Sequence, residues 1–95
     1  MQDLVEERLA ALRTRPVAQL QLLSDCSEED VVLNGKSIKL TTYHAISNEG
    51  SQRVVIQAIR QRWGGLTAKV VVSGFETAND GTVRALTDEE LYDYT

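Results

Sequence analysis

The spacing of apolar residues near the start of the chain predicts a helix over residues 3–13. Val5, Leu9 and Leu12 recur at intervals of four and three residues, which places them on one stripe of a helix. Asp3 can accept hydrogen bonds from the free amides of the first turn. The only proline of the chain follows and ends this pattern, because proline has no backbone N–H to donate.

The next segment, residues 17–24, fits two structures. Its alternation of apolar residues and glutamines is typical of a strand, whereas Val17, Leu20 and Leu23 match the spacing of a short helix. We favour the helix. Residues 24–30 are polar and acidic, and we expect them to form a loop.

From residue 31 the pattern changes to that of strands. Three apolar residues precede Asn34-Gly35, a pair typical of the type I′ turn in a two-residue hairpin. In the strand that follows, side chains alternate between two faces. One face carries apolar residues, a threonine and the only histidine: Ile38, Leu40, Thr42, His44 and Ile46. The other face carries Lys39, Thr41 and Tyr43.

Residues 52–63 fit both a helix and a strand. A helix would gather the apolar residues on one side, with Trp63 among them, and would end at Gly64. A strand would use the β-branched residues of the segment and turn at Gly64-Gly65 directly into an apolar strand over residues 69–73. We predict the strand.

A two-residue turn at Gly64-Gly65 also fixes the register between these two strands. The favourable cross-strand pairs are Trp63 with Leu66, Ile59 with Val70, Val54 with Phe75, and Arg53 with Glu76. The same register sets Arg60 against Lys69, which is unfavourable unless a bulge or an anion separates the two charges.

The end of the chain predicts a hairpin turn, a short strand and a helical turn. The sequence Asn-Asp-Gly at residues 79–81 is a turn signal that leads into a strand over residues 82–86. Thr87 can cap the final turn, with Glu90 three residues later as in a capping box. Tyr94 can then fold back on the sheet.

Together these elements predict a single α+β domain over residues 1–95. We expect an N-terminal helix packed on an antiparallel meander sheet of four to five strands, followed by a short C-terminal helix, with the helices on one face of the sheet. The chain is 42% hydrophobic and 25% charged, which is typical of a globular protein rather than a disordered one.

Composition and charge exclude several classes of protein. The formal net charge is -4, whereas dedicated DNA-binding domains are usually basic. Cys26 is the only cysteine, so neither an intramolecular disulfide nor a cysteine-rich zinc site can form. No segment resembles a signal peptide or approaches the roughly 20 apolar residues of a membrane span. We therefore expect a cytoplasmic protein with no membrane partner.

Few residues are candidates for catalysis. His44 is the only histidine, and we predict that it is half-buried and hydrogen-bonded. Neighbouring carboxylates disfavour a thiolate at Cys26. The acidic run Glu28-Glu29-Asp30 lacks the ligand spacing and the glycine of a calcium loop. We predict no catalytic residue, no metal and no cofactor.

Basic side chains are concentrated between residues 51 and 75, a stretch without any acidic residue. The candidate interaction surface consists of the basic residues and the only tryptophan: Arg53, Arg60, Arg62, Trp63 and Lys69. Such a surface can form the rim of a protein interface anchored by Trp63, or it can hold phosphates and stack bases. A third interpretation is that Arg60 and Arg62 pair with the acidic N-terminal helix or the C-terminal helix.

Three functions follow from these interpretations. The first, which we favour, is a noncatalytic protein-interaction module, with a homodimer formed by self-pairing of an open sheet edge as one form. The second is a weak nucleic-acid-binding module that uses the basic hairpin 53–69. The third is a small-ligand carrier or minor enzyme with a pocket between sheet and helix and with His44 or Tyr43 at its mouth.

Overall fold

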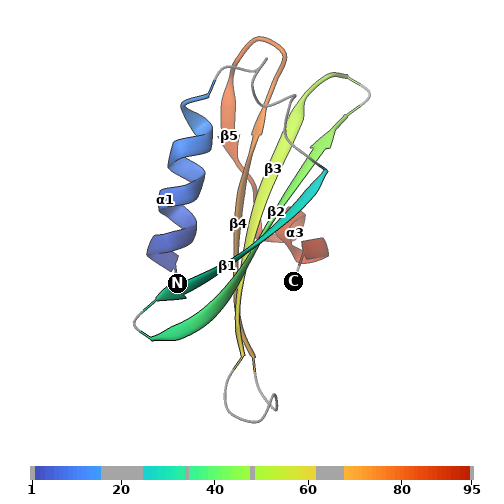
Figure 1. The fold of residues 1–95 in the computed structure, drawn as a ribbon. Helices are drawn as coiled ribbons and strands as arrows, with labels where there is room; N and C mark the ends of the chain where they lie inside the picture. The colour runs from blue at the N-terminus through green and yellow to red at the C-terminus, as the bar shows by residue number, and fades with distance from the viewer. Residues whose placement is uncertain (1, 16–24, 34, 48, 62–67, 95) are drawn as a thin grey trace.

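The structure is a computed structural model that describes residues 2–15, 25–33, 35–47, 49–61 and 68–94. Its elements, in chain order, are α1 (Gln2–Arg13), β1 (Cys26–Leu33), β2 (Lys36–Ile46), β3 (Gln52–Gln61), β4 (Ala68–Thr77), β5 (Val83–Ala85), α3 (Asp88–Leu91) and η2 (Tyr92–Tyr94). The strands form one antiparallel sheet in the order β1-β2-β3-β4-β5, so that each strand pairs with the next one along the chain (Figure 1). The structure confirms the predicted helix, antiparallel meander and short terminal helix.

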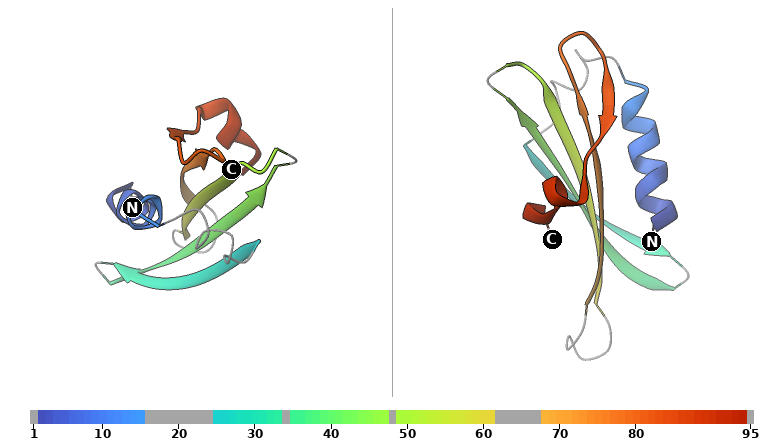
Figure 2. Two further views of the ribbon diagram at one scale, coloured as in Figure 1. Left: turned by 90° about the horizontal axis from the view of Figure 1, so that it is seen from above. Right: turned by 180° about the vertical axis from the view of Figure 1, so that it is seen from behind.

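Apolar side chains are covered on both faces of the sheet. α1 packs on one face, whereas α3 and η2 lie on the other (Figure 2). β3 explains this arrangement, because Val54 and Ile56 belong to the cluster beneath α1 and Val55 packs with Leu86 and Leu91. The expectation that both helices share one face is wrong, since a strand that is apolar on both sides needs a cover on each.

The N-terminal helix α1 agrees with the helix predicted over residues 3–13. Val5 and Leu9 are fully buried against the sheet, as the apolar stripe predicted. Phe75 of β4 lies in the same cluster, and the guanidinium carbon of Arg13 is 5.7 Å from the centre of its ring. Most sheet contacts of α1 are with β4 and β3, so the helix lies over one half of the sheet.

The segment that fits both a helix and a strand is the strand β3, as predicted. Its register with β4 contains each predicted pair that falls within the described residues: Ile59 with Val70, Val54 with Phe75, Arg53 with Glu76, and Arg60 with Lys69. The Gly64-Gly65 turn, the pair of Trp63 with Leu66 and the helix over residues 17–24 lie outside the described part of the chain.

The prediction of a loop over residues 24–30 is wrong, because β1 begins at Cys26. β1 pairs along its whole length with β2. Its acidic side chains are exposed, and the Lys39 ammonium on β2 lies 3.2 Å from the Glu28 carboxylate. A strand at the edge of a sheet tolerates such charges, which also discourage other chains from pairing with it.

The turns and the C-terminal cap agree with their sequence signals. Gly35 has φ +76° between β1 and β2, a left-handed conformation that glycine adopts without strain. The Thr87 hydroxyl accepts a hydrogen bond from the Glu90 backbone N–H, and the Glu90 carboxylate accepts one from the Thr87 N–H, which completes the predicted capping box. Tyr94 folds back on the sheet, with its ring centre 5.2 Å from that of Tyr43.

Candidate interaction surface

The predicted basic surface is divided between the two faces of the sheet. Arg53 pairs with Glu76 near one end of β3, and Arg60 pairs with Lys69 near the other end. Arg60 follows Arg53 by seven positions, which corresponds to about 23 Å along a strand and places their side chains on opposite faces. Arg62 and Trp63 lie outside the described residues. The three described members therefore do not form one continuous patch.

Arg53 takes part in an ion-pair network that joins β3 to the end of the chain. Its guanidinium lies 3.0 Å from the Glu90 carboxylate and 3.7 Å from that of Glu76. Arg84 of β5 donates to the same two carboxylates. Only 33% of the Arg53 side chain is exposed, so this arginine stabilises the fold rather than offering a free charge. The predicted Arg53–Glu76 pair was the only sequence signal for this network.

Glu90 is the residue on which this network depends. Hydrogen bonds from the Arg84 guanidinium, and then from the Thr87 backbone N–H, lower the pKa of Glu90 from its ordinary value of 4.5 to about 2. The hydrogen bonds that Arg84 itself donates to Glu90 raise the pKa of Arg84. One carboxylate thus serves both the cap of α3 and the contact between α3 and β5.

Docking of the C-terminal helical turn is expected to weaken as pH falls from about 4.5 toward 2. A carboxyl whose pKa is lowered by folding stabilises the folded state above its unfolded pKa, and this contribution is lost as pH falls through the folded pKa. Amide NMR signals of Leu91 and Tyr94 followed against pH measure the effect. The variant Glu90→Gln cannot titrate at this position, so a pH dependence identical to that of the wild type would contradict the assignment to Glu90.

Arg60 and Lys69 lie beyond the last pair between β2 and β3, on the part of the β3–β4 hairpin that β2 does not accompany. The last β2 residue paired with β3 at this end is Lys39, opposite Ile59. Arg60 and Lys69 are directly opposite each other and share a face, which brings two like charges together as predicted. Neither has an ion-pair partner among the described residues, so the proposed pairing of Arg60 with a terminal helix is not found there.

The outer edge of β4 is open along the same hairpin. β5 pairs with β4 only at residues 75–77, and the Leu86 N–H adds one hydrogen bond to the Gly74 carbonyl, at 3.0 Å. Backbone groups two residues apart in a strand point the same way, so the N–H and C=O groups of Val72 and Val70 also point to this outer side. Among the described residues, no strand pairs with them.

The two edges of the sheet differ in character. The edge formed by β1 carries three consecutive exposed carboxylates, at residues 28–30. The open edge of β4 has the sequence Lys-Val-Val-Val-Ser over residues 69–73, and the Val70 side chain is 41% exposed. A long apolar edge is a template for strand pairing, whereas a charged edge resists it. The sequence contained the apolar run of β4, but the strand order was needed to show that it forms an edge.

His44 belongs to a buried pair of polar side chains. It is 5% exposed, more buried than predicted, and its Nε2 atom lies 2.8 Å from the side-chain oxygen of Gln52, so the predicted hydrogen bond is present. The Thr77 hydroxyl is also buried near the end of the same face, and no residue that the structure describes is hydrogen-bonded to it. Tyr43 lies on the opposite face, as predicted, near Tyr94.

The described residues contain no group of three or more His, Cys, Asp and Glu side chains that could hold a metal ion. Cys26 is exposed at the start of β1. Within the described ranges, no helix combines the length and the apolar character needed to cross a membrane.

Comparisons with protein-family models, with curated proteins and with solved structures found no match for this chain.

Proposed function

We propose that this protein is a noncatalytic interaction module, and that it pairs with a second copy of itself along the open edge of β4. The observation that supports this proposal is the stretch of β4 from Lys69 to Ser73, which has an antiparallel neighbour on one side only among the described residues. Strand addition at such an edge uses main-chain hydrogen bonds for affinity and alternate side chains for specificity.

The sequence of this edge favours a second copy as the partner. In an antiparallel pair centred on Val71, the two Val71 residues face each other, and Val70 of one chain lies opposite Val72 of the other. Lys69 lies opposite Ser73, so no like charges meet within the pair. Valine-to-valine pairs suit adjacent strands, because β-branched side chains pack well on a pleated surface.

The expected dimer is weak. Val70 and Val72 each offer one N–H and one C=O, so the symmetric pair closes four main-chain hydrogen bonds, each worth about 0.5–1.5 kcal/mol. Ordering two chains offsets much of this gain. We therefore expect a transient dimer that becomes populated only as the protein concentration rises from micromolar to millimolar.

Val70→Pro is expected to abolish the concentration-dependent increase in mass measured by sedimentation velocity. Proline removes the backbone N–H of Val70, which points outward, and leaves the bonds between β4 and β3 in place. Val70→Thr is the matched control, because it keeps both the β-branched shape and the N–H, and we expect it to dimerise as the wild type does. A wild-type chain that remains a strict monomer across this range would remove the proposal.

Amide hydrogen exchange identifies the edge that is used. With rising concentration, exchange of the Val70 and Val72 amides should slow, because these groups become hydrogen-bonded in the dimer. Exchange of the Val71 amide should change little, since its N–H already points toward β3. Protection that appears instead on β1 would place the interface at the other edge.

A second candidate function is weak binding of nucleic acid at the projecting hairpin. The observation that favours it is the pair of like charges at Arg60 and Lys69, which has no acidic partner in the described part of the chain. Such binding would weaken steeply with salt, because phosphate contacts release counterions. Titration of the chain's only tryptophan, Trp63, with short single strands at low and high salt tests it, and salt-insensitive or absent binding removes it.

A further inference from the structure

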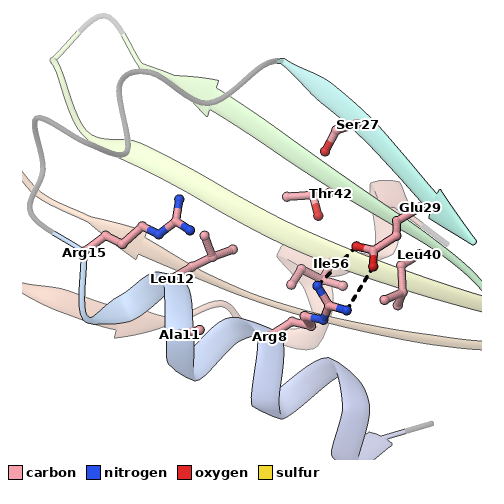
Figure 3. A pocket seen from close by; sticks show the side chains of 9 residues that line it. All are labelled: Arg8, Ala11, Leu12, Arg15, Ser27, Glu29, Leu40, Thr42 and Ile56. Carbon is pink, nitrogen blue, oxygen red and sulfur yellow. Dashed lines mark hydrogen bonds and ion pairs between the residues drawn. The ribbon is translucent and has the colours of Figure 1, made fainter. Parts of the chain in front are cut away.

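A groove of about 220 Å³ lies between α1 and the half of the sheet that the helix does not cover (Figure 3). Its apolar floor comes from three elements: Leu12 of α1, Leu40 of β2 and Ile56 of β3. Leu40 and Ile56 are 3% and 2% exposed, so the floor reaches the core beneath α1. The groove follows from the position of α1 over β3 and β4, which leaves β1 and β2 beside the helix rather than under it.

The charged groups around the groove are not balanced. Arg8 donates two hydrogen bonds to the Glu29 carboxylate, at 3.0 and 3.2 Å, so these two charges neutralise each other. Arg15 lies along the same side of the groove, toward the end of the helix (Figure 3). Its guanidinium has no hydrogen bond or ion pair with any residue in the described ranges. Counting the described residues that line it, the groove therefore carries one uncompensated positive charge, in a chain whose net charge is -4.

Two hydroxyls face the helix from the sheet side of the groove. Ser27 of β1 and Thr42 of β2 line it opposite α1. Neither hydroxyl is hydrogen-bonded to another side chain or to the backbone in the part of the chain that the structure describes. Arginine binds carboxylates through two parallel hydrogen bonds, and hydroxyls can donate to the same oxygens.

We propose that this groove binds a small monocarboxylate with an apolar body, whose carboxylate is held by Arg15 and whose hydrocarbon part lies on Leu12, Leu40 and Ile56. A single uncompensated arginine matches one negative charge. An apolar cavity of about 150 Å³ holds one benzene ring. A groove of 220 Å³ therefore accommodates a ring or a short alkyl chain together with its carboxylate. This site is separate from the β4 edge, and the proposal does not depend on dimerisation.

Titration of the ¹⁵N-labelled protein with hexanoate tests the proposal by NMR. We expect saturable shifts of the Leu40, Thr42 and Ile56 amides, with a dissociation constant in the millimolar range because the ligand is small. Hexanol has the same chain without the charge, and it should bind at least about tenfold more weakly, since hydrogen bonds to charged groups are the stronger ones.

Two variants of α1 separate a site from general charge attraction. Arg15→Gln should weaken hexanoate binding at least about tenfold while leaving hexanol binding unchanged. Arg13→Gln removes the same charge from the same helix, but Arg13 lies over Phe75 outside the groove, so hexanoate should bind as to the wild type. Equal affinity for hexanoate and hexanol, equal weakening in both variants, or no saturable shift at these amides would each overturn the proposal.

Discussion

Replacement of Phe75 by alanine is expected to lower the free energy of unfolding by about 3–5 kcal/mol. Phe75 is fully buried in the cluster beneath α1, where it packs with Val5 and Leu9. Its ring also lies under the Arg13 guanidinium. A chain of this size is expected to have about 5–10 kcal/mol of total stability, so this one change should bring the protein close to unfolding.

Urea denaturation followed by far-UV circular dichroism measures this loss. Phe75→Leu keeps most of the buried volume and should cost only about 1–2 kcal/mol. Val32→Ala is the control for an exposed position, since Val32 is 72% exposed on β1, and its effect should stay within about 0.5 kcal/mol. A loss below about 1 kcal/mol for Phe75→Ala would mean that α1 is not held on the sheet by this ring.

Gly74→Ala is expected to destabilise the protein by about 1–3 kcal/mol, although alanine is ordinarily favoured over glycine inside a strand. A Cβ atom at position 74 would lie 2.6 Å from the Val54 carbonyl oxygen and 2.9 Å from a methyl carbon of Leu86. The first of these atoms belongs to the backbone of the neighbouring strand and cannot move without disturbing the β3–β4 pairing.

The same urea titration, carried out in two backgrounds, separates the two contacts. Truncation of Leu86 to alanine removes the methyl carbon but leaves the Val54 carbonyl in place. The cost of Gly74→Ala should therefore persist in the Leu86→Ala background. A Gly74→Ala protein that is as stable as the wild type, or more stable, would show that strand propensity outweighs the close approach of the two strands.

The sequence predicted the centre of the sheet well because two independent signals agree there. The turn glycines indicated one register for β3 and β4. The cross-strand pairs of that register, such as Val54 with Phe75 and Arg53 with Glu76, were favourable and so supported it. Packing then required that register, since a slip by one residue would exchange the two faces of β3.

The first half of β1 was not predicted, because its residues carry no apolar pattern of their own. The acidic half of β1 forms a strand because β2 supplies hydrogen bonds along its length, and nothing in its composition indicates this. The sequence did not predict that α3 covers the second face of the sheet. Val54 and Val55 are neighbours in an apolar run, so β3 lacks the alternation of apolar and polar residues that marks a strand with one buried face.

The candidate sites depend on distances between elements that a single sequence does not contain. The open edge of β4 exists because β5 is only three residues long. The groove exists because α1 lies over β3 and β4 rather than across the whole sheet. The predicted pocket between helix and sheet is present, but neither His44 nor Tyr43 lines it.

Three contacts meet on Glu90, and they bear on how the segment from β5 onward opens. This carboxylate accepts hydrogen bonds from Thr87, Arg84 and Arg53, which belong to the start of α3, to β5 and to β3. Because all three contacts end on one side chain, any movement of Glu90 away from this position weakens all of them together. We therefore expect the segment from β5 onward to open as one cooperative unit, which would uncover Val55 while α1 still covers the other face.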